Sequence, residues 1–219
     1  MAVINSGPAG YRVVSRGTQA DIYIYGPIGA DWFGEGISAK MFADDLKKIG
    51  AVATLNVRIN SEGGSVFDGR TMHSLLVDHA AKKIVHVDGL AASAASFLAM
   101  AGDEIEIAKG AFMMVHNSAI VTFGGAEDLR RTADLLDSVN ATIRETYAAR
   151  SKAPLDTVRG WMDAETWFTG PEAVAAGLAD RTVADMKVAA SLRRPDQFRN
   201  LPVALRPNRA KALRILRAV

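Results

Sequence analysis

The sequence contains no cysteine among its 219 residues. This absence excludes disulfide bonds, cysteine-ligated zinc and catalysis by a thiol, and it is compatible with a reducing cytoplasm. Long apolar runs are also missing, because charged residues interrupt each one well before it reaches the length of a membrane span. Residues 1–6 contain no basic region that leads into an apolar stretch, so no signal peptide is expected. We therefore expect a soluble, cytoplasmic protein that does not contact a membrane.

Apolar residues make up 49% of the chain and charged residues 23%, which is ordinary for a globular protein with a sizeable core. At this length we expect one domain at residues 21–186, with an N-terminal segment at residues 1–20 and a tail at residues 187–219. The tail holds nine Lys or Arg and one Asp, so its net charge is +8 in a chain whose total is +2. The rest of the chain is therefore acidic.

Three prolines punctuate the tail and argue against one continuous helix. Two interpretations stay open for it: a solvated terminus, or an arm that docks to an acidic partner or joins the domain to other material. Nucleic acid is not expected as a partner, because Phe198 is the only aromatic residue that the tail offers for base stacking.

Strand and helix patterns alternate along the chain. Strands are predicted at residues 21–25, 54–59, 84–87, 105–108 and 112–115, and helices at residues 38–49, 66–80, 93–101, 126–150, shortly after Pro154, and 172–176. Strands that alternate with helices imply an α/β fold with a largely parallel sheet and right-handed crossovers. The carboxyl ends of the strands in such a sheet are where ligands bind.

Three loops follow the carboxyl ends of predicted strands. Small residues surround Ser93, and such a turn from strand to helix exposes the serine and leaves nearby N–H groups free to bind a negative oxygen. The glycine-rich loop at residues 60–64 and His116 follow two other strands. A serine becomes a nucleophile when a general base such as histidine removes its proton. The residues therefore predict the active site of a serine peptidase.

Four motifs together resemble the ClpP-type serine peptidases in order and spacing. They are Asn60-Ser61-Glu62-Gly63-Gly64, Gly89-Leu90-Ala91-Ala92-Ser93, Met114-Val115-His116, and Pro171-Glu172-Ala173 with Gly177-Leu178-Ala179-Asp180. The resemblance covers about Asp21 to Val183, and it is greatest to the head maturation proteases of phages and prophages. It implies a ClpP/crotonase-like fold with a long handle helix, a polypeptide substrate, and homo-oligomeric rings, possibly stacked. It also implies a phage capsid or scaffold protein as partner, and no cofactor or metal.

The resemblance assigns a role to several residues. Ser93 is the nucleophile, and His116 is the general base and then the acid that protonates the leaving amine. The N–H groups of Gly64 and Ala94 form the oxyanion hole. Substrate binding falls to a further set of glycines, Gly63, Gly124 and Gly125. Ser96, one helical turn beyond Ser93, is a rival nucleophile that we interpret as a packing residue.

The sequence departs from the family pattern at two positions. Glu165 stands where the typical ClpP peptidase has the aspartate that accepts the imidazole N–H. Asp163 is an alternative to Glu165, and a Ser–His pair without any carboxylate is a third possibility. Glu62 stands where the family usually has proline, which leaves the rigidity of the glycine loop open.

Other functions remain as alternatives. A crotonase-like acyl-CoA hydratase or isomerase would use the same oxyanion hole without a nucleophile. A Ser–Lys peptidase would need Lys109 or Lys152 beside Ser93, and a catalytically inactive scaffold would need neither. Ser93 and His116 at the family spacing favour the peptidase.

Overall fold

The computed structural model describes residues 2–7, 10–29, 36–184, 190 and 192–206. Its strands are β1 (Ala2–Ser6), β2 (Arg12–Arg16), β3 (Gln19–Ile24), β4 (Thr54–Ser61), β5 (Lys82–Ala92), β6 (Glu104–Ala108), β7 (Phe112–Val115), β8 (Thr166–Thr169) and β9 (Arg181–Val183). Its α-helices are α1 (Ala39–Ile49), α2 (Val66–Asp78), α3 (Ala94–Ala99), α4 (Ala126–Ser151), α5 (Leu155–Asp163) and α6 (Gly170–Ala175). Two 3-10 helices, η2 (Pro195–Gln197) and η3 (Val203–Leu205), follow in the tail.

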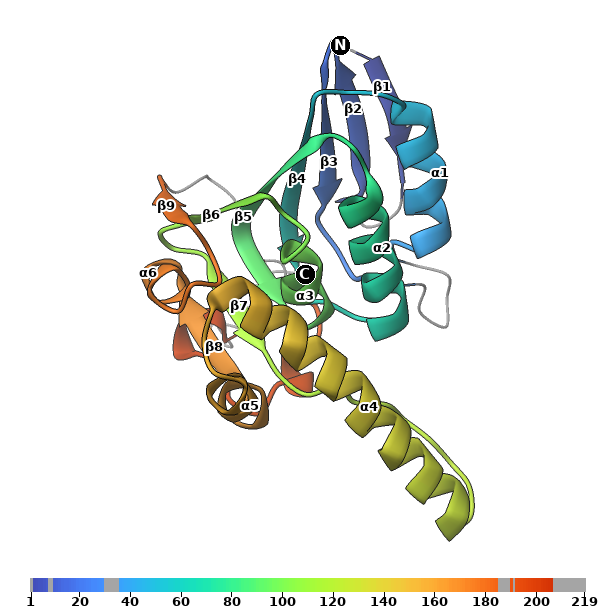
Figure 1. The fold of residues 1–219 in the computed structure, drawn as a ribbon, viewed down its shortest axis with the longest axis vertical. Coiled ribbons are helices and arrows are strands. Elements are labelled where there is room, and N and C mark those ends of the chain that lie inside the picture. The colour runs from blue at the N-terminus through green and yellow to red at the C-terminus, as the bar shows by residue number, and fades with distance from the viewer. Residues whose placement is uncertain (1, 8–9, 30–35, 185–189, 191, 207–219) are drawn as a thin grey trace, which may run out of the picture.

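All nine strands belong to one sheet (Figure 1). The strand order is β1-β2-β3-β4-β5-β6-β9, while β7 pairs with β5 and β8 pairs with β7. The strands from β3 to β6 run parallel, as do the pairs β6-β9 and β5-β7, whereas β1-β2, β2-β3 and β7-β8 are antiparallel. The predicted α/β fold with a largely parallel sheet is confirmed.

The two faces of the sheet differ in polarity. Ile22, Val57 and Val85 lie in register on one face, which helices α1, α2 and α3 cover to form the main core. The opposite face carries polar side chains, and there Arg58 and Asp88 form an ion pair with 2.5 Å between Nη2 and Oδ1. Side chains alternate between faces along a strand, so one sequence period gives an apolar and a polar face. The functional loops follow from the ends of these strands.

Every strand and helix that the sequence analysis placed is present within a few residues, while four strands were missed. β1 and β2 fall in residues 1–20, which we expected to precede the domain, and they extend the sheet at its β3 edge. β8 and β9 are strands of four and three residues. Segments this short carry too little alternation to distinguish a strand from a loop.

Helix α4 is the long helix that was expected. Its 26 residues span about 39 Å, and its N-terminal half projects from the body beside the loop that leads into it (Figure 1). Its buried residues, Val139, Ile143 and Tyr147, all lie in the C-terminal half. Within the described residues, no helix combines the length and the apolar character of a membrane span.

The described part of the tail packs against the domain. Phe198 and Leu201 are each only 7% exposed and lie in a small apolar cluster with Leu90, Ala92 and Met114. The interpretation of the tail as a solvated terminus is therefore wrong for residues 192–206. Single aromatic and aliphatic residues without helical or strand spacing gave no sequence signal for this contact. Residues 187–189, 191 and 207–219 of the predicted tail lie outside the described residues.

Candidate active site

Ser93 stands at a sharp turn between β5 and α3. Its φ of 55° and ψ of −126° put a non-glycine residue into backbone space that usually favours glycine. Its N–H donates to the carbonyl of Met114 at 3.0 Å, which ties the turn to the neighbouring strand β7. Backbone strain of this kind costs about 1–3 kcal/mol and persists only where the surrounding structure holds it. The turn directs the Ser93 side chain out of the sheet.

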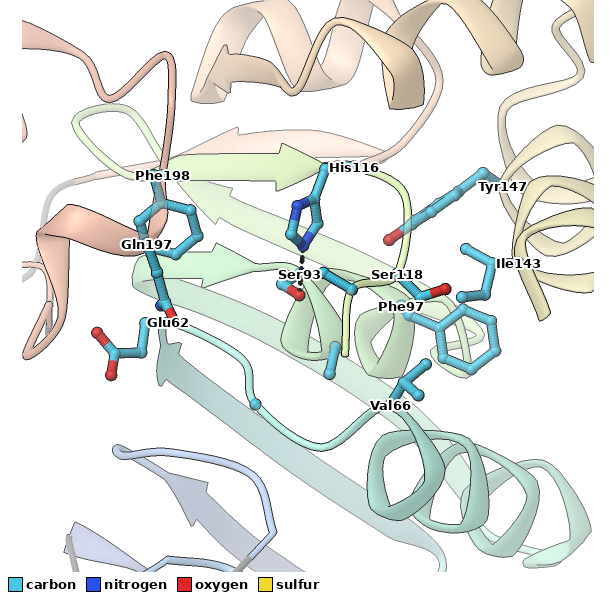
Figure 2. Close-up of a pocket in the computed structure, with 13 residues that line it drawn as sticks. Glu62, Val66, Ser93, Phe97, His116, Ser118, Ile143, Tyr147, Gln197 and Phe198 are labelled. Atoms are coloured by element: carbon cyan, nitrogen blue, oxygen red, sulfur yellow. Dashed lines mark hydrogen bonds between the residues drawn. The ribbon is translucent and has the colours of Figure 1, made fainter. Parts of the chain in front are cut away.

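His116 follows β7 directly and faces Ser93. Parallel pairing of β5 with β7 places Ala92 opposite Met114, so the residues that follow the two strands come out side by side. His116 Nε2 lies 2.7 Å from Ser93 Oγ, as the dashed line in Figure 2 marks. The two residues are 23 positions apart in sequence. The structure thus brings together the hydroxyl and the imidazole that the sequence analysis paired.

Ser96 has a different environment from Ser93. It is fully buried, and its Oγ lies 2.6 Å from the carbonyl of Met114 and 2.8 Å from the hydroxyl of Tyr147. A hydroxyl held by buried partners cannot reach a substrate. Ser96 is therefore a packing residue of α3.

The glycine loop after β4 lies against the Ser93 turn. A Cβ at Gly63 would lie 2.7 Å from Ser93 Cβ and 2.9 Å from the amide nitrogen of Ala94, and the φ of 91° at Gly63 also favours glycine. The next residue, Gly64, has a φ of 141° and is exposed. Ala94 is the first residue of α3, so its N–H has no partner within the helix. Both residues line the cavity that Ser93 and His116 share.

Glu165 and Asp163, the two candidates for the third catalytic residue, lie in different surroundings. Glu165 is 3% exposed and has a φ of 50° in the turn between α5 and β8. Its carboxylate accepts N–H donors from Asn200 at 2.8 Å and Arg199 at 3.1 Å. Among the described residues, no hydrogen bond or ion pair joins Glu165 to His116. Its charge nevertheless acts on the imidazole.

Asp163 is exposed and accepts a hydrogen bond from the Asn117 side chain at 2.7 Å. It does not line the cavity of Ser93 and His116. The structure favours Glu165 over Asp163 as the carboxylate that influences the site.

Burial is the main influence on His116. Removal of the imidazole from water lowers its pKa, the negative charge of Glu165 raises it, and the positive charge of Arg199 lowers it. A low pKa keeps the imidazole neutral, and a neutral imidazole is the form that can accept the proton of a serine. The electrostatics therefore favour the base form of His116 near neutral pH.

The cavity beside Ser93 has a volume of about 170 Å³. On one side its wall is apolar, with Val66, Phe97, Ile143 and Tyr147 contributed by α2, α3 and α4. On the opposite side of the Ser93–His116 contact lie Glu62, Gln197 and Phe198 (Figure 2). Sequence reasoning did not assign these three residues to the site. The sequence analysis noted Glu62 as a departure from the family pattern, because it replaces the usual proline. The residues of the tail that Glu62 contacts could not be inferred.

A second cavity of about 1010 Å³ continues from the first. Its lining includes the backbone around Gly64 and Ser65, the exposed residues Ile120 and Val121, and the apolar side chains of α4. Gly124 and Gly125 line neither cavity, because they lie at the outer N-terminal end of α4. Their role in substrate binding stays a prediction, and they precede a helix whose buried residues lie in its far half.

The remaining histidines make contacts away from Ser93. His73 packs on Phe97 with ring centroids 4.8 Å apart, and His86 pairs with Glu106 at 2.8 Å between Nδ1 and Oε2. Within the part of the chain that the structure describes, no three metal-ligating side chains cluster.

Comparison with known proteins supplies the family. The sequence model of the Clp protease family matches residues 7–186 of this chain. The chain belongs to the Clp protease family. The match includes the Ser93 turn, the glycine loop, His116 and Glu165, whereas the tail residues that line the site lie beyond it.

Curated Clp relatives are moderately similar in sequence. An ATP-dependent Clp protease proteolytic subunit of Chlamydomonas reinhardtii is 32% identical over 125 residues, which cover 56% of this chain and 24% of that protein. Subunit 3 of Rhodococcus jostii is 31% identical over 128 residues, covering 57% and 63%. The subunit of Porphyromonas gingivalis is 26% identical over 172 residues, covering 78% and 72%. The chain thus spans less than two thirds of the length of the first two relatives.

A solved structure has the same fold. A ClpP1 mutant from Listeria monocytogenes superposes with a TM-score of 0.66 at 19% identity, covering 75% of this chain and 91% of that one. This likeness confirms the ClpP-like fold, including the largely parallel sheet and the long helix α4.

Proposed function

We propose that this protein is a serine endopeptidase that cleaves peptide bonds through an acyl-enzyme. The observation that carries the proposal is the 2.7 Å contact between Ser93 Oγ and His116 Nε2, at a strained turn in the cavity that Gly64 and Ala94 also line. Nucleophile, base and oxyanion donors within one small cavity are the constellation that acyl transfer requires. Membership of the Clp protease family supports the same chemistry.

The proposed reaction has two steps. Ser93 Oγ attacks the peptide carbonyl while His116 Nε2 takes the hydroxyl proton, and the negative oxygen binds the N–H groups of Gly64 and Ala94. His116 then gives that proton to the leaving amine as the C–N bond breaks. A water molecule, deprotonated by His116, next attacks the ester and releases the acid and the free serine. Glu165 stabilises the protonated imidazole by its charge.

The two cavities fit an extended polypeptide substrate. The cavity of about 170 Å³ next to Ser93 would receive an apolar side chain against Phe97, Ile143 and Tyr147. The neighbouring groove would hold the preceding residues, which can pair as an added strand with the backbone around Ile120. A preference for an apolar residue at the cleaved carbonyl follows.

We further propose that the enzyme works as a homo-oligomeric ring in the cytoplasm of a bacterial host and matures a phage capsid or scaffold protein. Exposed apolar residues on the projecting half of α4 and on the loop before it support self-association, among them Ile120, Val121, Phe123, Leu129 and Leu135. The phage role depends on the resemblance of three segments to head maturation proteases: Tyr23-Ile24-Tyr25-Gly26, residues 91–96 and residues 162–168. Cleavage of a co-expressed phage scaffold protein, absent with the Ser93→Ala variant, would test it.

A fluorophosphonate probe tests the peptidase chemistry directly. Such probes phosphonylate activated serines, so the assembled protein should gain one adduct at Ser93, located by peptide mass spectrometry. Ser93→Ala should abolish the adduct, while Ser96→Ala, three residues away, should keep it. An assembled protein that hydrolyses peptides without labelling, or that labels at another residue, would refute the assignment. A crotonase-like hydratase would give no adduct at all.

A further inference from the structure

Residues 193–201 form one side of the active site, and we name them the C-terminal wall. They lie opposite the apolar cavity side in Figure 2, where Gln197 and Phe198 flank the Ser93–His116 contact. These residues come from the tail, more than 75 positions after His116 in the sequence.

Two buried glutamates hold the wall by its backbone. Glu62 Oε2 accepts the N–H groups of Arg193 at 2.7 Å and Arg194 at 3.0 Å. Glu165 accepts those of Arg199 at 3.1 Å and Asn200 at 2.8 Å. Glu62 and Glu165 are each about 97% buried, and each carboxylate accepts hydrogen bonds from two consecutive amides of this segment. Hydrogen bonds to a buried charge are among the stronger ones in proteins.

Between the two anchors, Phe198 contacts the catalytic histidine. The centroid of the Phe198 ring is 6.4 Å from that of the His116 ring. It is 5.2 Å from that of the Trp167 ring, which Phe198 meets edge to face. Phe198 is 7% exposed and also covers Leu90 and Met114, which are fully buried beneath the wall. Removal of the wall would expose this apolar cluster, so the segment is built in as part of the core.

We propose that the C-terminal wall is a permanent component of the active site and that Phe198 is a positioning residue for His116. The anchors Glu62 and Glu165 fix the wall, and the Phe198 ring then limits the rotation of the imidazole and keeps water from its face. This inference rests on the proposed peptidase function, and it adds a part of the site that the tail supplies.

The surroundings of His116 determine the sign of the expected effect. The charged or titratable groups that face it are Glu165, Arg199, Glu62 and Tyr147, and none of them changes when Phe198 is replaced. Loss of the ring lets water reach the imidazole, and hydration favours the protonated form. The pKa of His116 therefore rises, and the acid limb of the pH–rate profile moves to higher pH.

The experiment compares Phe198→Ala with Phe198→Leu and Val203→Ala in the full-length protein. Leucine keeps an apolar side chain in place, and Val203 is a matched control in the tail that is 77% exposed. Fluorophosphonate labelling of Ser93 is measured against pH, and the titration of His116 is followed by carbon-13 NMR of labelled histidines, with His116→Gln as the assignment. Phe198→Ala should slow labelling at pH 7 by roughly ten- to a hundredfold, as expected for a displaced catalytic group. In Phe198→Ala, the midpoint of the pH dependence of labelling and the midpoint of the His116 titration should both move to higher pH. Phe198→Leu should restore most of the labelling rate, and Val203→Ala should match the wild type.

Glu62→Ala provides a second variant that leaves Phe198 in place and removes only one anchor. It should slow fluorophosphonate labelling of Ser93, because the wall that holds Phe198 against His116 loses one anchor, with circular dichroism and the melting temperature as checks on folding. Unchanged titration of His116 in folded Phe198→Ala protein, or unchanged labelling in folded Glu62→Ala protein, would overturn the inference, and so would faster labelling, which would mean that the wall blocks the site. Failure of wild-type Ser93 to label would instead refute the peptidase function, while the NMR titration still tests the wall.

Discussion

The turns at Ser93 and Glu165 share an unusual backbone but serve different partners. Both hold a non-glycine residue at positive φ, 55° and 50°, next to a strand of the same sheet. The Ser93 turn points its side chain at His116, whereas the Glu165 turn points its carboxylate at the amides of the tail. Strain therefore marks both places where the fold presents a functional group. It does not reveal what that group contacts.

The largest effect that separates the two turns comes from the loss of the nucleophile. Ser93→Ala should reduce peptide hydrolysis by about 10⁶-fold, since the attacking atom is gone. Hydrolysis of a fluorogenic peptide, measured at saturating substrate, checks this. Ser96→Ala is the control: it should lower stability by about 1–3 kcal/mol through buried polar groups left unpaired, while its folded fraction stays active. Equal activity of Ser93→Ala and wild type would mean that the strained turn does not present a nucleophile.

Gly64→Ala tests the loop that lies against the Ser93 turn. A Cβ there would come within 2.1 Å of the Ile28 carbonyl at a φ of 141°, so the loop must shift and its N–H must leave the oxyanion position. We expect kcat to fall by about 10²–10³-fold, the cost of one lost oxyanion donor.

Gly17→Ala is the matched control for Gly64→Ala. Gly17 also has a positive φ, of 62°, but nothing lies within 4 Å of its added Cβ. It should lose about 1 kcal/mol of stability and no activity per folded molecule. Similar kinetics for the two alanine variants would contradict the role assigned to the Gly64 amide.

Glu165→Gln and Arg199→Gln sharpen the comparison by moving the pH profile in opposite directions. The charge of Glu165 raises the pKa of His116, so its removal should shift the acid limb to lower pH; removal of Arg199, which lowers that pKa, should shift it to higher pH. The loss in kcat for Glu165→Gln should stay well below the roughly 10⁴-fold cost of replacing a triad aspartate that hydrogen-bonds its histidine. A loss of that size would show a direct contact during turnover. Asp163→Asn should leave the profile unchanged.

The smallest effect concerns a third strained residue with no functional partner. Lys152 ends α4 with a φ of 60°, and its side chain is exposed. Lys152→Gly should raise the free energy of unfolding by a few tenths to about 1 kcal/mol, because glycine is the residue that this cap position favours. Denaturant unfolding and peptide hydrolysis together measure it. We interpret the backbone strain at Lys152 as structural only, in contrast to the strain at the Ser93 and Glu165 turns. A change in the rate of peptide hydrolysis would contradict that interpretation.

Local patterns in the sequence predicted most of the scaffold and half of the site. Ser93 and His116 follow strands, and neighbouring parallel strands end at one edge, so their meeting follows from topology. The partners of Glu62 and Glu165 could not be predicted, because they lie 131 and 34 positions away in a segment without periodicity. The role of Gly124 and Gly125 in substrate binding stays a prediction, since these glycines precede the projecting end of α4 and lie outside both cavities.

The hydrogen bond from Ser93 to the carbonyl of Met114 has an evolutionary consequence. It continues the ladder between β5 and β7, so main-chain pairing sets the spacing of the two backbone segments that carry the alcohol and the base. Mutations on the exterior, outside the C-terminal wall, can then remodel substrate preference and the projecting half of α4 over generations without eroding reactivity. In a lineage with this arrangement, substrate preference can change while the catalytic reaction is conserved.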